Sequence, residues 1–263
     1  MDATIGIVTW RARELLKGCL DSIYTFTDGL SYEIIVVDNW SCDGTVEMVL
    51  EKYPHVILIQ NKKNQGVASA RNEILRLARA RYVIVLDVDT VVHPNSLRNL
   101  VEIMDQNPQA VIGGPKLVYG DGKLQFSART FPSLLNIMIE GTFLKDYFPN
   151  SGFVKKYTME NWDHRCLREV DWMYGACLII RSSGLRTLGL FDEKFFYLYE
   201  DVDLCLRAKY LGMKVIYIPQ ATVTHFLERE RRSIVSRTLF VHLRSIIRYL
   251  YKKYFYYRYK YKR

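Results

Sequence analysis

The chain has 263 residues, of which 49% are hydrophobic, so it can bury a sizeable core and intrinsic disorder is not expected. Its five cysteines stand singly without a CxxC pair, which argues against a disulfide framework or a cysteine-rich zinc site and favours a reducing compartment. Residues 228–263 hold 12 Lys or Arg against two Glu, which leaves 25 basic and 26 acidic residues in 1–227. The net charge of +9 therefore resides in the tail.

No basic segment followed by a cleavable apolar segment opens the chain, so no secretory leader is expected. The longest apolar runs, such as residues 82–86, are far shorter than the ~20 residues that a membrane-spanning helix needs. We therefore expect a cytoplasmic protein that is soluble or bound peripherally at the inner face of a membrane.

Strand and helix patterns alternate along the first 112 residues. The segment 34–37 is apolar without interruption, which is typical of a strand buried on both faces of a parallel sheet. Repeated strand–helix–strand units predict an α/β fold with a mostly parallel sheet flanked by helices. The expected strands are 4–9, 31–38, 56–59, 82–86 and 110–112, and the expected helices lie near 15–23, 43–53, 67–78 and 94–107.

The alternation fades beyond residue 113. Residues 119–170 have no clear period, and long aperiodic stretches inside compact enzymes are usually lids or binding loops. We expect this segment to fold over a crevice. The pattern resumes with expected strands at 177–180, 215–218 and 222–225 and an expected helix at 202–211.

Acidic residues stand where predicted strands end. Asp38 closes the second strand and Asp87 the fourth, and ligands of open α/β sheets bind beyond the carboxyl ends of the strands. Asp87 and Asp89 can both turn toward one hard cation, Mg²⁺ or Mn²⁺, and His225 at another strand end could complete the metal site. The alternative is that the aspartates are solvated loop acids and that the histidine is structural.

Two phosphate-binding motifs are missing from the sequence. No GxGxxG follows a strand and no GxxxxGK[ST] occurs, so neither a dinucleotide fold nor a P-loop is predicted. A bound nucleotide diphosphate would need a metal on the aspartates to neutralise its charge.

A second acidic group, Glu200-Asp201-Val202-Asp203, opens a predicted helix. Acids in a first turn complement the helix dipole and cap free N–H groups, which accounts for one or two of the three. The preceding aromatic run, residues 195–199, would place at least one carboxylate against apolar surface. Such burial raises a carboxyl pKa and favours its use as a general base.

The joint order of these motifs over residues 3–226 is specific. It closely resembles glycosyltransferase family 2, which has the Rossmann-like GT-A fold, and most of all its rhamnosyltransferase-like branch. The likeness rests on Val36-Val37-Asp38-Asn39, Asp43-Gly44-Thr45, Asn64-Gln65-Gly66-Val67-Ala68, Leu86-Asp87-Val88-Asp89, Asp171-Trp172, Gly175-Ala176-Cys177, Gly189-Leu190-Phe191-Asp192-Glu193 and Tyr199-Glu200-Asp201-Val202-Asp203.

The resemblance implies a donor site. Thr9, Asp38 and Arg71 would contact the nucleoside of a nucleotide-diphosphate sugar. Asp87 and Asp89 would act at the metal and the diphosphate. It also implies that residues 1–118 form a nucleotide-binding half of a catalytic domain that extends to residue 227.

The resemblance further implies an acceptor-binding half at 119–227. Asp201 would be the catalytic base, and Trp172, Gly175, Ala176 and Glu200 would lie beside the sugar and the acceptor. One base and one metal suit in-line displacement with inversion, because no second carboxylate is needed as a nucleophile. The expected enzyme moves a sugar such as rhamnose to a hydroxyl of a glycan or polyprenyl-linked saccharide in cell-surface polysaccharide synthesis.

Two departures from the family pattern concern base recognition: Thr9-Trp10-Arg11 stands where many relatives have Asn-Tyr-Asn, and Trp40 where small residues are common. Two rival functions also stay open. A sugar nucleotidylyltransferase would use a similar fold with Mg²⁺, but its glycine-rich basic loop is absent. A nucleic-acid-binding protein could use the basic aromatic tail, although the neutral body argues against it, and no nucleic-acid partner is expected.

The tail is predicted to be a basic amphipathic helix. Apolar positions Leu239, Leu243, Ile246, Ile247, Leu250 and Tyr254 follow helical spacing, with Arg237, Arg244, Arg248 and Lys252 expected on the other side. Such a segment, 233–263, can lie on an anionic membrane surface. It can equally pack on the catalytic domain, or do both in different halves.

Overall fold

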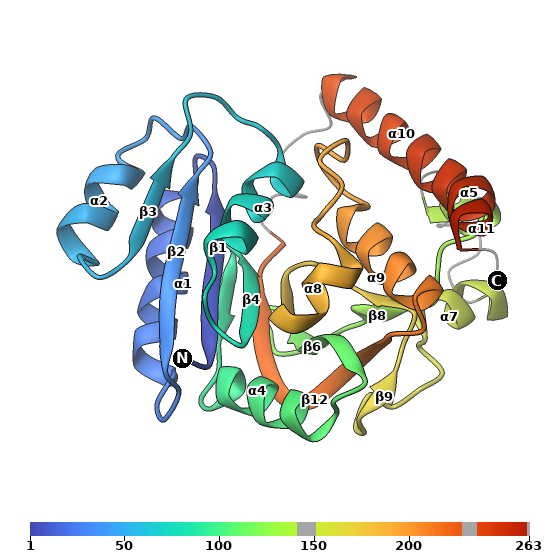
Figure 1. The fold of residues 1–263 in the computed structure, drawn as a ribbon, viewed down its shortest axis with the longest axis horizontal. Helices are drawn as coiled ribbons and strands as arrows, with labels where there is room; N and C mark the ends of the chain where they lie inside the picture. The colour runs from blue at the N-terminus through green and yellow to red at the C-terminus, as the bar shows by residue number, and fades with distance from the viewer. Residues whose placement is uncertain (141–150, 228–235, 262–263) are drawn as a thin grey trace.

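The computed structural model describes residues 1–140, 151–227 and 236–261 (Figure 1). Within them, a ten-stranded, mostly parallel sheet has the order β3-β2-β1-β4-β11-β6-β12-β5, with β7 beside β6 and β9 beside β12, and β8 pairs with β10 separately. The strands are β1 Ala3–Thr9, β2 Tyr32–Asp38, β3 Ile57–Gln60, β4 Tyr82–Asp87, β5 Thr90–Val92, β6 Ala110–Val118, β7 Leu124–Gln125, β8 Ala128–Arg129, β9 Arg168–Glu169, β10 Trp172–Met173, β11 Cys177–Arg181 and β12 Lys214–His225. The helices are α1 Arg13–Phe26, α2 Thr45–Lys52, α3 Val67–Leu77, α4 Ser96–Gln106, α5 Leu134–Glu140, α7 Gly152–Thr158, α8 Ser182–Leu188, α9 Glu200–Tyr210, α10 Ser236–Tyr251, the π-helical η1 Lys252–Tyr256 and α11 Tyr257–Lys260.

The central strands are buried on both faces, as their uninterrupted apolar runs predict. In β4, Ile84 and Leu86 join the core layer that holds α1 and α4, whereas Val83 and Val85 join the layer that holds α3, α8 and α9. Successive side chains of a strand point to opposite faces, so each layer takes every second residue. The predicted α/β fold with helices on both faces is confirmed.

Strand register gathers polar residues at one edge of the sheet. The parallel strands β1, β2 and β4 pair Thr9 with Asp38 and Val8 with Asp87. At the far side of the sheet, β5 pairs antiparallel with β12, so that His225 stands opposite Thr90. A residue from the end of β12 thereby reaches the turn that follows β4.

Two features differ from the sequence prediction. The strands expected at 215–218 and 222–225 are one strand, β12, whose pairing with β6 shifts register between Ile218 and Thr222. Pro219 lies in this stretch, and a proline that cannot donate a ladder hydrogen bond is accommodated at such an irregularity. Residues 119–170 also contain short elements in their described part, β7, β8, α5, α7 and β9, while 141–150 lie outside the described residues.

The C-terminal helices α10 and α11 pack against the body beside α9, at the opposite end of the molecule from α2 (Figure 1). Tyr249 and Tyr257 are fully buried in the core layer of α9. None of the described helices is both long and apolar enough to cross a membrane. The side chains of Arg237 and Leu239 and the whole of 228–235 fall outside the described residues.

The tail helix packs on the body, but not with its charged side in solvent, as the packing alternative of the sequence analysis implies. Arg248 and Lys252, predicted on the side opposite the apolar positions, face the body and bind Asp192, with Lys252 Nζ 2.7 Å from its carboxylate. Leu243 and Ile247, which belong to the predicted apolar side, are 52% and 60% exposed. Buried carboxylates of the body select cations for the inner face, a demand that the helical period alone does not reveal.

Lys252 is the anchor of this contact, and its ammonium is buried between Asp192 and Asp203, 2.7 Å from each. Removing one partner of a buried ion pair leaves uncompensated charge. Lys252→Met is therefore expected to lower the free energy of unfolding by roughly 3–5 kcal/mol, measured by urea denaturation. Arg81→Met, which removes an exposed cation paired with Asp2 and Asp105, is the control and should cost below about 1 kcal/mol; equal losses would contradict the buried anchor.

Candidate active site

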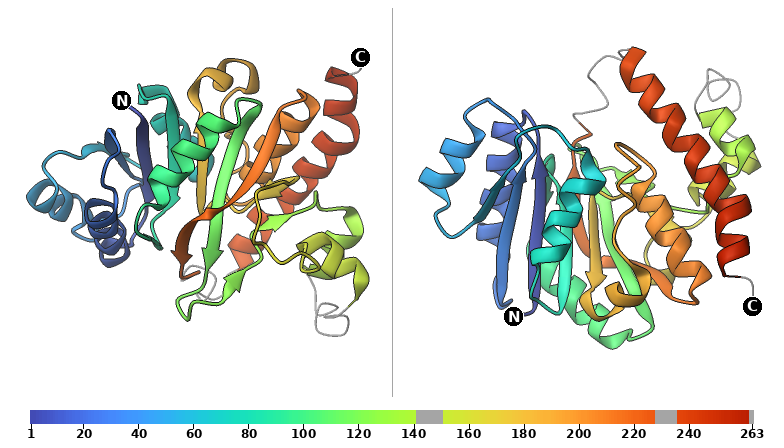
Figure 2. Two further views of the ribbon diagram at one scale, coloured as in Figure 1. Left: turned by 90° about the horizontal axis from the view of Figure 1, so that it is seen from below. Right: turned by 45° about the horizontal axis from the view of Figure 1, so that its top comes forward.

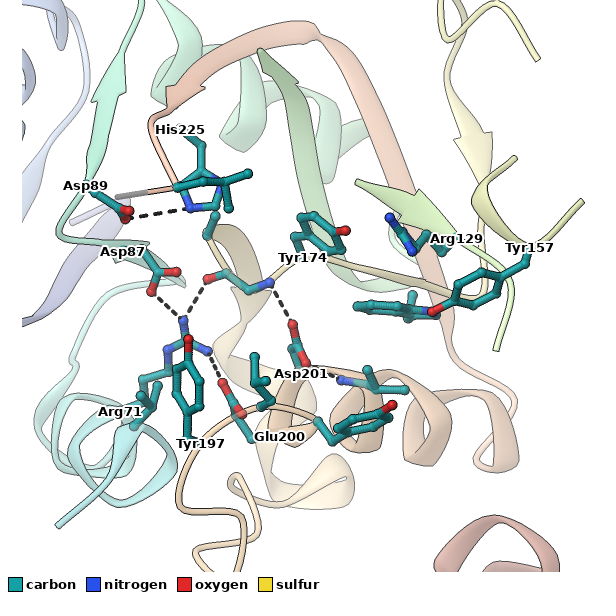
Figure 3. A pocket seen from close by; sticks show the side chains of 18 residues that line it. Arg71, Asp87, Asp89, Arg129, Tyr157, Tyr174, Tyr197, Glu200, Asp201 and His225 are labelled. Atoms are coloured by element: carbon teal, nitrogen blue, oxygen red, sulfur yellow. Dashed lines mark hydrogen bonds and ion pairs between the residues drawn. The ribbon is translucent and has the colours of Figure 1, made fainter. Parts of the chain in front are cut away.

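Three predicted metal ligands meet at the carboxyl edge of the sheet (Figure 3). Asp87 ends β4 and Asp89 follows in a turn whose middle residue, Val88, is fully buried and directs both acids to one side. The pairing of β5 with β12 brings His225 alongside. One ligand atom from each of the three side chains lies within 4.8 Å of the others. Two carboxylates and an imidazole form a donor set that suits Mn²⁺ or Mg²⁺.

The ring of His225 is oriented by Gln125, a residue that the sequence analysis did not single out. The amide oxygen of Gln125 lies 2.8 Å from Nδ1, so Nδ1 carries the proton and donates it. This leaves Nε2, 3.6 Å from Asp89 Oδ1, with a lone pair for a cation. Gln125 is only 1% exposed, so the surrounding side chains fix its position, and its hydrogen bond keeps the imidazole in this orientation.

Arg71 joins this edge to the second acidic group. The side chain comes from α3, is 3% exposed, and donates through Nη2 to Asp87 Oδ1 and to the carbonyl of Gly175, both at 2.8 Å. Its Nη1 donates to Glu200 Oε1 at 3.1 Å. Figure 3 shows the guanidinium between the two carboxylates. The predicted contact of Arg71 with a nucleoside stays a prediction.

Gly175 fits between Arg71 and Asp201. Its backbone N–H donates to Asp201 Oδ2 at 2.8 Å, while Val202 N donates to Oδ1 at 2.7 Å. A Cβ at position 175 would lie 2.7 Å from Arg71 Nη1, closer than real Cβ contacts allow. Only glycine lets the backbone approach both groups.

Burial raises the pKa values of both acids of the second group. The pKa of Glu200 rises from 4.5 to about 7, because burial and the neighbouring Asp201 outweigh the attraction of Arg71. Burial likewise raises the pKa of Asp201, opposed by Arg71 and by the backbone N–H groups that bind it. A carboxylate with a raised pKa in a pocket can accept a proton near neutral pH.

Aromatic residues form the opposite wall of the pocket, across from the metal edge (Figure 3). Trp172 pairs with Arg129 between β10 and β8, and the Arg129 guanidinium stacks over Tyr157 and Tyr174. Of these four residues the sequence predicts only Trp172 as part of the site, and the aromatic content of residues 119–170 is the available hint for Tyr157. The pocket is lined by Val67, Arg71, Asp87, Asp89, Arg129, Tyr157, Trp172, Tyr174, Gly175, Ala176, Tyr197, Leu198, Tyr199, Glu200, Asp201, Val202, His225 and Leu227.

Thr9 and Asp38 lie at the same edge of the sheet but outside this lining. Both are buried, and Thr9 Oγ1 and Asp38 Oδ1 have no hydrogen-bond partner within the described residues. The other oxygen of Asp38 accepts from Ser41 N at 3.2 Å. All the other predicted site residues line the pocket. They are Arg71, Asp87, Asp89, Trp172, Gly175, Ala176, Glu200, Asp201 and His225.

The family model for glycosyl transferase family 2 matches residues 4–167, more than half of the chain. The chain belongs to this family. The rhamnosyltransferase WbbL of Escherichia coli K12 is 36% identical over 262 residues, which cover 95% of this chain and 92% of the relative. The N-acetylglucosaminyl-diphospho-decaprenol L-rhamnosyltransferase of Mycobacterium tuberculosis H37Rv is 32% identical over 203 residues, or 73% of this chain and 66% of the relative, so the chain matches just under two thirds of that protein. The predicted family 2 membership, enzyme class and likeness to rhamnosyltransferases are confirmed.

Solved structures of glycosyltransferases share the fold of this family 2 chain. GalNAc-T7 with UDP, GalNAc and Mn²⁺ matches with a TM-score of 0.64 at 17% identity, over 86% of this chain and 44% of that one. The mannosyltransferase PcManGT of Pyrobaculum calidifontis, in complex with GDP-Man and Mn²⁺, matches with a TM-score of 0.60 at 20% identity, over 87% and 58% of the two chains. The predicted GT-A fold is confirmed.

The raised pKa of Glu200 makes stability depend on pH. Between about pH 4.5 and 7, the native carboxyl keeps a proton that the unfolded chain releases, so stability falls as pH rises through this window. Glu200→Gln, which cannot ionise, is expected to flatten this slope in urea unfolding at a series of pH values. Glu102→Gln, at an exposed position of α4, is the control, and a Glu200→Gln slope equal to the wild-type slope would contradict the assignment.

Proposed function

We propose that this family 2 enzyme moves a sugar, rhamnose by analogy with its relatives, from a nucleotide-diphosphate donor to a hydroxyl of a glycan or lipid-linked saccharide. Transfer proceeds with inversion and serves cell-surface polysaccharide synthesis. The observation that carries the proposal is one pocket that has the Asp87, Asp89 and His225 cluster at one side and Asp201 beside it. Membership of glycosyl transferase family 2 favours glycosyl transfer over nucleotidyl transfer or nucleic-acid binding.

Asp87, Asp89 and His225 would hold a divalent cation, Mn²⁺ or Mg²⁺. Their hard oxygen donors and the free Nε2 of the imidazole fit such an ion, and GalNAc-T7 and PcManGT were solved with Mn²⁺. Bound there, the cation would act as a Lewis acid that stabilises the charge growing on the leaving diphosphate.

Thr9 and Asp38 would contact the nucleoside at the neighbouring strand ends. Their buried oxygens without partners in the described residues support this role, since buried polar atoms without partners are costly unless a ligand or water binds them. Arg71 would keep Asp87 in place beneath the diphosphate and contribute positive charge near it. The donor thus spans the carboxyl edge from β2 to β4.

Asp201 would remove the proton of the acceptor hydroxyl. Two backbone N–H groups orient its carboxylate, and its raised pKa makes it a better base than an exposed aspartate. Trp172, Gly175, Ala176 and Glu200, which line the same pocket, would position the acceptor. With Glu200 holding its proton to about pH 7, Asp201 would be the ionised member of the pair.

We further place the enzyme in the cytoplasm at the inner face of the membrane, as a peripheral protein bound through residues 233–263. The division into 1–118, 119–227 and 228–263 is part of this proposal. The mycobacterial relative is named for a decaprenol-linked acceptor, which supports a site of action at a lipid surface.

Asp201→Asn tests the base. The amide keeps the shape of the side chain but cannot accept the proton, so we expect a loss of transfer of at least about 100-fold with donor binding retained. Transfer is measured by mass spectrometry of the products, and donor binding is measured by calorimetry. Asp163→Asn, a change outside the pocket, is the control; full turnover by Asp201→Asn would remove this residue from the base role.

Asp87→Ala tests the metal site. For wild type, UDP-, dTDP- or GDP-sugars should raise the Tm only when Mn²⁺ is present, because ligand binding to the native state stabilises it. The variant should lose this Mn²⁺-dependent shift. Asp121→Asn, an exposed acid away from the cluster, should keep it, and an undiminished shift in Asp87→Ala would count against the site.

A further inference from the structure

The outward side of the tail carries an apolar stripe along α10, η1 and α11. Its members recur every three or four positions, and their exposed fractions range from 52% to 87%. Figure 2 shows these helices, in red, on one side of the molecule, with the yellow-green α5 and α7 region next to them. The stripe consists of Phe240, Leu243, Ile247, Tyr251, Phe255 and Tyr259.

Polar contacts on the inner side fix the rotation of the helix, so that the stripe cannot turn inward. Ser245 Oγ donates to the carbonyl of Tyr197 at 3.0 Å, and the buried hydroxyl of Tyr249 donates to that of Pro132 at 3.0 Å. Farther along, Lys252 binds two carboxylates. Rolling the helix to bury the stripe would break all these buried bonds.

The π-helical segment η1 keeps this inner face continuous. Lys252 and Tyr257 are five positions apart, a spacing that i→i+5 hydrogen bonding brings to one side of a helix. Both reach Asp203, from Lys252 Nζ at 2.7 Å and Tyr257 Oη at 2.9 Å. On the outward side, Phe255 within η1 and Tyr259 in α11 continue the stripe.

The charge around the stripe indicates what it binds. From Arg231 to Arg263 the sequence holds 11 Lys or Arg and no Asp or Glu. Arg244, Arg258 and Lys260 are exposed beside the apolar side chains. Apolar and aromatic side chains flanked by cations suit the interface of an anionic bilayer, where each cation near the surface contributes on the order of 1 kcal/mol.

We infer that the stripe of α10, η1 and α11 is the surface on which the enzyme lies against an anionic bilayer, with Phe240, Leu243, Ile247, Tyr251, Phe255 and Tyr259 in the lipid interface. The inference rests on the proposed function for its biological sense, since a lipid-linked acceptor must be met at a membrane. Contacts on the inner side of α10 support a link between this surface and the pocket. Ser245 binds the backbone of Tyr197, and Tyr249 packs 5.2 Å from the ring of Tyr199, so the docking helix contacts the wall of the pocket directly.

Vesicle flotation of the full chain tests the surface. Wild type should float with vesicles that contain phosphatidylglycerol and much less with pure phosphatidylcholine. The double variant Ile247→Ser/Phe255→Ser should have a partition coefficient onto these vesicles at least roughly tenfold lower than that of wild type, because it removes two exposed apolar side chains from the interface. Leu50→Ser/Leu77→Ser, which removes comparably exposed side chains from α2 and α3, is the matched control and should float like wild type.

The outcomes separate the surface from its alternatives. Absence of wild-type flotation, or equal flotation of the Ile247→Ser/Phe255→Ser variant, would overturn the inference. A wild-type dimer in sedimentation that this variant loses, without flotation, would overturn it also and assign the stripe to a second copy. Transfer to a water-soluble acceptor is measured in parallel and should be unchanged in this variant; flotation without transfer by wild type would reject the proposed function alone.

Discussion

The arrangement of the site depends on one buried arginine, Arg71. The Arg71 guanidinium lies among Asp87, Glu200 and Asp201, and its positive charge opposes the burial and the Asp87 charge that raise the pKa of Asp201. Burying an arginine is itself costly and is offset only when its donors are satisfied, which here requires the carbonyl of Gly175 as well as the carboxylates. One side chain from α3 therefore fixes the end of β4, the start of α9 and the loop between β10 and β11 relative to each other.

Much of the fold followed from the sequence because its pattern is local. The apolar runs of β2 and β4 and the acids at their ends gave the parallel sheet and the edge where ligands bind, and Asp87 with Asp89 stood out without any tertiary information. Gln125 and Arg129 could not be found in this way. Gln125 belongs to a two-residue strand, and its role depends on β12 bringing His225 to it across 100 positions of sequence.

The tail shows a second limit of periodicity. A hydrophobic period identifies two faces of a helix but assumes that the apolar one is buried, and α10 breaks that assumption because Asp192 and Asp203 require cations on the inner side. Hydrogen bonds from Lys252 and Arg248 overcome the effect of burial and lower the pKa of Asp192 to about 2, so the carboxylate stays charged and the contact persists across the physiological range. Knowing which face turns inward requires knowing what lies beneath it.

The position of His225 in the chain has a consequence for how the Asp87, Asp89 and His225 cluster is assembled during synthesis. His225 stands at the end of β12, the last strand of the body, while Asp87 and Asp89 precede it by well over a hundred residues. A ribosome-bound chain that has emerged only through β11 holds the two aspartates but lacks the imidazole, so the cluster is incomplete at that stage. The three side chains come together only when β12 pairs with β5, which links assembly of the cluster to completion of the body.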